Sequence, residues 1–427
     1  MLTAFLFFSA CLQAQVMVVR VDGNKVYLDT SVLNRNVQKG DLFKVILSAE
    51  KLTNPKTGKD LGLVYNYSKE GKIVEVQPLY AIGEVAADKR ISVGQEVVLT
   101  ATVPAPQPPA VTVQETAKTS SHRKTVYEPV EQEIIGVTEA NITGADNFIT
   151  LSKKGQVTVW TQGEKNTLKE ELSFTLPAGK RVLTVSAAPV KDKKAQIFVS
   201  YFDEKRQTIS TAVLENQNGT LKEITSLSYF AKELGCGQNK QIWLQKPFVS
   251  GAYPGNARLI AYTDGKFAPA KETLSTYRNW LTGLNRYAVE SADVQNIIYT
   301  SSNGPLRLVT ASGKRAESKD LFAAAPNRVK YKQEILKFYP SVQVFGPEGR
   351  ATLAAVENIS KLGILSDTFG QYKSSKIHFL AFKKGRLSVT DTVELDGVVY
   401  DTACTDKAIL TAEVLPDGNS SVVEIFK

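Results

Sequence analysis

The side chains that most often carry catalysis and metal binding are scarce in this chain. Its 427 residues include 2 His, 3 Cys and 2 Met. Two histidines cannot assemble a multi-histidine metal site, and three cysteines nearly exclude a zinc–cysteine cluster. No Gly-x-Ser-x-Gly, P-loop or Gly-x-Gly-x-x-Gly sequence occurs. We therefore predict no catalytic residue, no metal site and no bound cofactor.

The two histidines have different sequence surroundings. His378 alternates with apolar Ile377 and Phe379, a pattern that favours a hydrogen-bonded histidine within a strand over a catalytic base. His122 stands beside Arg123 in a polar stretch, which predicts a solvated side chain.

The cysteines allow two interpretations. Cys236 and Cys404 are far apart in sequence. Two buried thiols are favoured because unpaired cysteine is among the most buried residue types. The alternative is a disulfide, which an oxidising compartment would permit. Cys236 has glycine on both sides, but no nearby histidine could activate it as a nucleophile.

The N-terminus resembles a secretory signal. Residues 1–15 hold an apolar run too short to span a bilayer, followed by Leu12 and Ala14 at positions that suit cleavage. A second interpretation is a bacterial lipobox, Phe8-Ser9-Ala10-Cys11, with Cys11 as the lipidation site. A third is a buried N-terminal strand. We expect an exported protein, in the periplasm or associated with the outer membrane of a Gram-negative bacterium, with no transmembrane helix.

Composition limits the class of protein further. Hydrophobic residues make up 43% of the chain, which is enough for a core and excludes global disorder. Lys and Arg number 52 against 43 Asp and Glu, a formal charge of +9. Because the chain carries an export segment and no aromatic–basic RNA-binding sequence, we do not expect a nucleic-acid partner.

The sequence predicts an all-β protein with a small domain, a linker and a large domain. Residues 16–103 show short alternating strands joined by tight turns, which indicates a small β-barrel. Residues 104–127 begin with Pro104-Ala105-Pro106 and hold few large apolar residues, as is typical of a Pro-rich linker.

The remaining residues, 128–427, repeat a strand–turn–strand pattern about every 50 residues, which favours a β-propeller of six or seven blades. Two β-sandwiches are the alternative. A strand near 131–137 would complete the last blade. Trp160, Trp243 and Trp280 are expected in the core between blades. The six units are 148–160, 196–214, 241–262, 296–309, 351–382 and 408–426.

The small domain resembles the C-terminal domain of the flagellar assembly protein T family. The likeness rests on three stretches: Val37-Gln38-Lys39-Gly40-Asp41-Leu42, Asn54-Pro55-Lys56-Thr57-Gly58-Lys59-Asp60-Leu61-Gly62 and Ile91-Ser92-Val93-Gly94-Gln95-Glu96. It implies an exported envelope protein with no active site in this domain.

The large domain is similar to the FG-GAP/VCBS repeat group of propellers. The likeness rests on the stretches 306–313 and 376–387. Blades of that group often bind Ca²⁺ through several carboxylates in one loop, and calcium needs six or more oxygen ligands. The corresponding stretches here, at 191–196, 291–296, 346–350 and 405–408, hold at most one carboxylate each. We therefore predict a degenerate propeller without blade calcium.

These features together favour a non-catalytic envelope protein that binds another envelope protein. The first alternative is a periplasmic hydrolase that acts on glycans at the propeller's central channel, where convergent carboxylates would be expected. The second alternative is a carbohydrate-binding protein with exposed aromatic rings. Attachment to the membrane through lipid at Cys11 is compatible with each of them.

Overall fold

The computed structural model describes most of the chain. The described residues are 16–30, 37–53, 60–77, 80–86, 88, 90–100, 121–192, 194–287, 296–302, 304–310, 313–346, 351–361, 366, 370–383 and 386–427. The expected signal segment with Cys11, and most of the expected linker, lie outside them. The chain divides into two compact units. Unit 1 comprises Met1–Ala117 with Leu362–Leu365, and unit 2 comprises Lys118–Lys361 with Ser366–Lys427.

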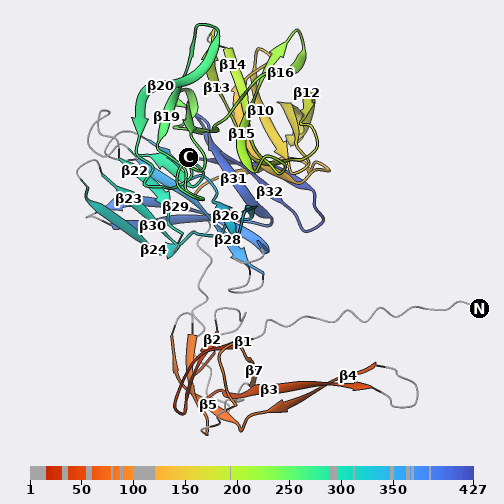
Figure 1. Ribbon diagram of the computed structural model, residues 1–427, viewed down its shortest axis with the longest axis vertical. Helices are drawn as coiled ribbons and strands as arrows, with labels where there is room; N and C mark the ends of the chain where they lie inside the picture. Colours follow the sequence, from red (N-terminus) through yellow and green to blue (C-terminus); the bar gives the residue numbers. More distant parts are fainter. Residues whose placement is uncertain are drawn as a thin grey trace, which may run out of the picture. The chain divides into compact units, whose positions relative to one another are not determined.

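Unit 1 contains a closed six-stranded barrel, which confirms the small β-barrel. Its strands pair in the order β3-β5-β6-β2-β1-β7, and β7 pairs again with β3. The seventh strand, β4, pairs antiparallel with β3 and extends away from the barrel with it (Figure 1). The strands are β1 (Val16–Asp22), β2 (Lys25–Asp29), β3 (Leu42–Thr53), β4 (Asp60–Tyr67), β5 (Gly71–Val76), β6 (Tyr80–Glu84) and β7 (Glu96–Thr100).

The barrel interior is built around one large ring. Phe43 on β3 is 1% exposed and lies among small aliphatic side chains such as Val26 and Ile73. Gly71 on β5 and Gly83 on β6 face this ring so closely that a β-carbon on either glycine would overlap it. A small barrel has room for few large side chains, so these two glycines make the space that Phe43 fills.

Unit 2 contains six four-stranded antiparallel sheets, numbered here in chain order. Sheets 4 and 5 are joined edge to edge by a single parallel pair, Ser318 with Leu387, and so form one eight-stranded sheet. Sheet 1 is β9 (Ile134–Asn141), β10 (Asp146–Ser152), β11 (Gln156–Gln162) and β12 (Leu168–Thr175). Sheet 2 is β13 (Lys180–Lys191), β14 (Lys194–Asp203), β15 (Thr208–Gln217) and β16 (Thr220–Leu227). Sheet 3 is β17 (Phe230–Leu234), β18 (Gln241–Gln245), β19 (Ala257–Thr263) and β20 (Lys266–Leu274).

The other three sheets follow the same plan. Sheet 4 is β21 (Leu284–Arg286), β22 (Ile297–Thr300), β23 (Pro305–Val309) and β24 (Arg315–Leu321). Sheet 5 is β27 (Gln343–Phe345), β28 (Thr352–Ser360), β29 (Tyr372–Lys383) and β30 (Arg386–Leu395). Sheet 6 is β31 (Val398–Cys404), β32 (Ala408–Val414), β33 (Ser420–Phe426) and β8 (Lys124–Val126). A hairpin, β25 (Asn327–Tyr331) and β26 (Glu334–Phe338), and two 3-10 turns, η1 (Glu164–Asn166) and η2 (Gly237–Asn239), complete the elements.

The all-β class is confirmed, and the six predicted strand–turn–strand units are present. Each unit corresponds to the second and third strands of one sheet, such as β10 with β11 and β32 with β33. These strands are rich in Ile, Val, Phe and Leu and are mostly buried. Residues of this kind fit a pleated surface that packs on both sides.

The strand that completes sheet 6 is not the predicted one. β8 pairs with β33 as its edge strand, whereas residues 134–141 form β9 and begin sheet 1, so the expectation for 131–137 is wrong.

The structure also differs from the predicted linker at its end. Tyr127 is buried and donates a hydrogen bond to Glu424 Oε2 at 2.8 Å. Short polar strands such as β8 resemble linker in sequence because pairing, not apolar content, holds them.

His122 is half-buried rather than solvated. Its ring stacks on Phe379 with a centroid distance of 3.7 Å, and Nδ1 lies 2.8 Å from the Phe426 carbonyl. Ser121 donates through its backbone nitrogen and its hydroxyl to Asp391 Oδ2, at 2.9 and 2.7 Å. These contacts fix the chain that leads into β8 against sheets 5 and 6.

The first strands of the sheets contact one another. β9 contacts β13 and β31, β13 contacts β17, and β27 contacts both β21 and β31. The β25–β26 hairpin packs on sheet 3, where Phe338 stacks on Phe230 at a centroid distance of 6.1 Å. Asn327 on this hairpin donates to the carbonyl of Leu183 on β13 at 2.9 Å. The first strands thus form the interior of unit 2.

Candidate binding cavity

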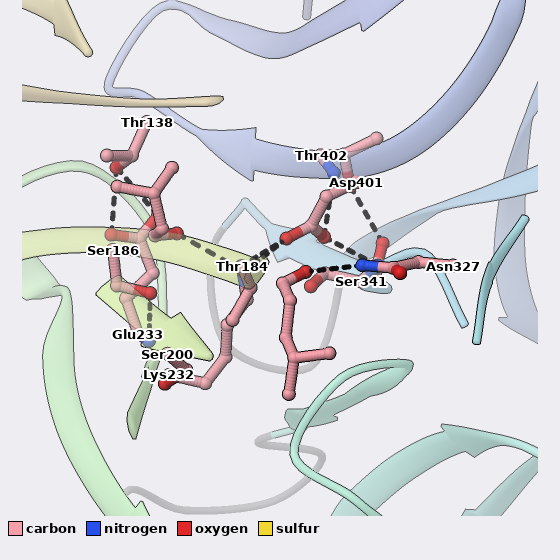
Figure 2. Close-up of polar contacts among 12 residues, drawn as sticks. Thr138, Thr184, Ser186, Ser200, Lys232, Glu233, Asn327, Ser341, Asp401 and Thr402 are labelled. Atoms are coloured by element: carbon pink, nitrogen blue, oxygen red, sulfur yellow. Dashed lines mark hydrogen bonds and ion pairs between the residues drawn. The ribbon is translucent and has the colours of Figure 1, made fainter. Parts of the chain in front are cut away.

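Polar side chains are concentrated on the first strands of sheets 1, 2, 3 and 6, where they are nearly inaccessible to solvent. Figure 2 shows how they converge from four strands. They are Thr138 on β9, Thr184 and Ser186 on β13, Lys232 and Glu233 on β17, and Asp401 and Thr402 on β31. Buried polar groups cost free energy unless they are paired, so each needs a partner here.

Lys232 and Asp401 form an ion pair inside this group. Lys232 Nζ donates to Asp401 Oδ2 at 2.6 Å, and the two side chains are 1% and 3% exposed. Thr184 Oγ1 lies 3.1 Å from Nζ and donates to the same carboxylate oxygen at 2.8 Å. The other oxygen accepts hydrogen bonds from the backbone nitrogens of Ser341 and Thr402 at 3.0 and 2.9 Å.

Glu233, next to Lys232 in the chain, is paired in a similar way. Thr138 Oγ1 lies 2.9 and 2.8 Å from its two carboxylate oxygens, and the backbone nitrogen of Ala187 donates to Oε2 at 2.9 Å. Lys240 Nζ is 3.8 Å from Oε2. Both buried carboxylates are therefore engaged in contacts that connect sheets.

A cavity of about 820 Å³ lies beside this buried group, at the C-terminal ends of β9 and β13. This volume falls within the range of small-molecule sites. Its walls combine carboxylates, amides, lysines and small apolar residues. They are Glu139, Ala140, Asn141, Ile142, Asp146, Ala187, Ala188, Pro189, Lys194, Ala195, Glu215, Asn216, Gly237, Gln238, Lys240 and Asp406.

The loop that contains η2 forms one wall of the cavity and is fixed at three points. Cys236 forms a disulfide with Cys404 at the end of β31. The backbone nitrogen of Gln238 donates to Asp406 Oδ1 at 3.3 Å. Lys240 Nζ donates to the carbonyl of Glu139 at 2.5 Å.

The disulfide corrects the expectation of two buried free thiols. The cysteines are 168 residues apart in sequence, and only the adjacency of sheets 3 and 6 brings them together. Gly237, beside Cys236, has a φ of +55°, and a β-carbon there would overlap the Asp406 carboxylate. Glycine at this position therefore permits both the backbone conformation and the close approach.

The cavity is acidic, although the chain as a whole is basic. Four carboxylates line it, against two lysines. Glu215 is paired with Lys191 at 3.4 Å, and Lys240 is engaged by Glu139 and Glu233. Burial raises the pKa of Glu139, and the neighbouring Asp146 and Glu424 raise it further, while Lys240 and Lys407 oppose the shift. A desolvated carboxylate near like charges favours its neutral form.

The histidines and tryptophans singled out from the sequence do not line the cavity. His378 Nε2 is 2.7 Å from Glu357 Oε2, and Nδ1 is 2.9 Å from Thr392 Oγ1, which confirms a hydrogen-bonded histidine within a strand. Trp160 and Trp243 are buried as expected, and Trp280 is half-buried against the core around Phe230.

Of the four loops compared with calcium sites, 291–295 and 347–350 fall outside the described residues. Asp406, from the last of those loops, belongs to the cavity wall. Within the part of the chain that the structure describes, no group of three or more His, Cys, Asp or Glu side chains is arranged to hold a metal ion.

The carboxylates of the cavity were not identified from the sequence. Glu139 and Asp146 lie on the two paired strands β9 and β10, whereas Asp406 follows β31, and no local spacing connects it to the other two. The one available signal was Asp406 in its Thr-Asp-Lys turn, which the calcium comparison had already drawn attention to.

Comparison with known proteins gives no family assignment. No family model matches the chain, and no curated protein matches it. Among the described residues, no helix is long and apolar enough to cross a membrane.

Proposed function

We propose that unit 2 is a six-bladed β-propeller that serves as a non-catalytic, protein-binding scaffold in a bacterial envelope. Six successive four-stranded antiparallel sheets support the propeller, as do the contacts among their first strands. The pairing of β8 with β33 supports ring closure, because it completes the last sheet with an N-terminal strand.

The observation that carries the scaffold proposal is the way the buried charges are used. Lys232, Asp401 and Glu233 each bind groups from other sheets. Separating the two charges of a buried ion pair is strongly unfavourable, which favours the arrangement of sheets that keeps Lys232 and Asp401 in contact. These contacts support a rigid framework with the cavity beside it as the binding site.

The disulfide supports an exported location. Disulfides persist in oxidising compartments and are rare in the reducing cytosol. The Cys236–Cys404 bond therefore agrees with the secretory interpretation of residues 1–15, and with a place in the periplasm or at the outer membrane. A family relation of residues 16–103 to the C-terminal domain of flagellar assembly protein T is part of the same proposal.

Site-specific photo-crosslinking tests the scaffold. A benzoylphenylalanine at Gln238, an exposed residue of the cavity wall, should give one defined adduct with an envelope protein in intact cells. Benzoylphenylalanine at Glu170, which is exposed on β12 outside the cavity, is the matched control. The proposal fails if the protein fractionates with the cytosol, or if both positions give the same adducts.

One observation favours a second function, glycan hydrolysis. Glu139 combines a raised pKa with a place in a cavity that also holds Asp146 and Asp406. A protonated glutamate and an ionised carboxylate are the pair that glycosidases use. Release of reducing ends from purified peptidoglycan, lost in Glu139→Gln, would establish this function in place of the scaffold.

A further inference from the structure

We infer that the cavity binds a primary ammonium group on an alkyl stem, as presented by a lysine side chain of a protein partner. The inference rests on the proposed binding function and specifies the chemistry that the cavity recognises. Three kinds of observation support it: the placement of charge, the apolar surface beside that charge, and the dispersal of the carboxylates.

The charge of the cavity favours a cation. Four carboxylates line the cavity against two lysines, Lys194 and Lys240, and one of those carboxylates, Glu215, is paired with Lys191 at 3.4 Å. Lys240 and Lys407 offset part of the charge of Glu139, and Lys427 lies within electrostatic reach of Glu139 and Asp406. A cation that enters the cavity would meet a wall that carries more carboxylates than ammonium groups.

The dispersal of these carboxylates favours an ammonium group over a metal ion or a guanidinium. Glu139 and Asp146 lie on the paired strands β9 and β10, and Asp406 lies on the turn after β31; no three ligating side chains in the described residues gather closely enough for a metal. A guanidinium is a planar fork that suits one carboxylate in two-point contact. An ammonium is a compact charge with three donors in different directions, which suits acceptors on separate walls.

The apolar part of the wall suits an alkyl stem. Ala140, Pro189 and Ala195 line the cavity and are each partly or fully exposed to solvent. Lysine carries four methylene groups below its ammonium, and these pack on apolar surface while the charge meets polar groups. A small inorganic cation would leave this surface without a contact.

The protonation of Glu139 provides an independent readout. Its carboxyl faces Lys240 and Asp146 in the cavity and lies within electrostatic reach of Glu424, Lys407 and Lys427. An ammonium ligand favours the ionised carboxylate, so binding should release a proton near the raised pKa of this group. Affinity for the ligand should therefore rise with pH across that range.

Calorimetry on the full chain tests the inference. The probes are the peptide acetyl-Gly-Lys-Gly-amide, the same peptide with acetyl-lysine, and free cadaverine as a ligand without a peptide. We expect saturable binding of the lysine peptide and binding at least about tenfold weaker for acetyl-lysine, as loss of a charged hydrogen bond implies. Absence of saturable lysine binding, or equal binding of both peptides, would overturn the inference. Binding of cadaverine without binding of the lysine peptide would show that the ligand is a free amine and not a lysine side chain of a protein partner.

Paired variants distinguish the effect of a carboxylate in the cavity from the effect of the protein's overall charge. Glu139→Gln should weaken binding of the lysine peptide about tenfold and remove most of its pH dependence. Glu170→Gln removes the same charge from β12 outside the cavity, and should leave the affinity unchanged. Equal effects of both variants would contradict the assignment. Absence of saturable lysine binding by the wild-type protein, with the Gln238 crosslink intact, would overturn this inference and leave the scaffold proposal standing.

Discussion

Lys232 Nζ lies 2.6 Å from Asp401 Oδ2, and this buried contact joins β17 to β31 across 169 residues of sequence. Thr184 of β13 bonds to both partners, so three of the six sheets meet at one ion pair. Removing one member leaves the other charge buried without a counterion, which costs more than the pair itself contributes.

Lys232→Met should therefore lower the free energy of unfolding of unit 2 by about 3–5 kcal/mol. Urea denaturation followed by tryptophan fluorescence measures this, because all three tryptophans, Trp160, Trp243 and Trp280, lie in unit 2. Lys153→Met is the matched control. Its partner Glu133 is at 2.7 Å, but Lys153 is 56% exposed, and such surface pairs contribute about 0–1 kcal/mol.

A double variant tests the reason for that loss. Lys232→Met combined with Asp401→Leu removes both charges and should recover part of the stability that the single change loses, although the backbone nitrogens of Ser341 and Thr402 lose their acceptor. A double variant as unstable as Lys232→Met alone would contradict the view that the uncompensated Asp401 carboxylate causes the loss in the single variant.

How much of this arrangement the sequence predicts depends on the side chains concerned. The second and third strands of each sheet could be located because their apolar residues recur in short runs, as at Ile197-Phe198-Val199. The first strands carry polar residues at buried positions, as in Phe230-Ala231-Lys232-Glu233-Leu234, and resemble exposed strands. Lys232 becomes a buried residue only through Asp401, and no local pattern links two residues of different sheets.

The cavity shows the same limit. Its carboxylates belong to separate elements, and the loop between them depends on Cys236 and Cys404 being paired. Sequence separation favours neither free thiols nor a disulfide, since pairing requires the α-carbons to be close in space. Here they are 4.7 Å apart, a distance that the sequence could not supply.

Reduction of the Cys236–Cys404 disulfide should destabilise unit 2 by about 2–4 kcal/mol, because the bond closes a long loop in the unfolded chain. The urea midpoint measured by tryptophan fluorescence should fall when a phosphine reductant is added. The double variant Cys236→Ser/Cys404→Ser should have the low midpoint in both conditions. A midpoint of the wild-type protein that does not respond to verified reduction would contradict this prediction.

The barrel of unit 1 should be sensitive to a single methyl group. Gly83→Ala places a β-carbon against the ring of Phe43 in a filled interior, and overpacking of this kind costs about 1–3 kcal/mol. Hydrogen exchange followed by mass spectrometry should show faster exchange in β5 and β6, with no change in sheets 1 to 6. Val93→Ala, at an exposed position, is the control. Gly94→Ala is less suitable because Gly94 has a φ of +91°, which an alanine would strain. Equal protection of β6 in Gly83→Ala and Val93→Ala would contradict the prediction.

The raised pKa of Glu139 implies a stability that depends on pH in a defined direction. The folded state holds the proton of this carboxyl more tightly than the unfolded chain, whose glutamates titrate near the ordinary value of 4.5. Between 4.5 and the folded pKa, the folded state therefore binds more protons, and stability falls as pH rises. Glu139→Gln removes the titrating group. The free energy of unfolding of this variant should equal that of the wild type at pH 4 and exceed it by a growing amount as pH rises above 4.5. At higher pH the difference should become constant. Urea midpoints of the two proteins from pH 4 to pH 8 measure this difference, in which the other titrating groups cancel. Glu170→Gln should show no such growth, and a gain for Glu139→Gln that is the same at every pH would mean that burial does not penalise the charged form of Glu139.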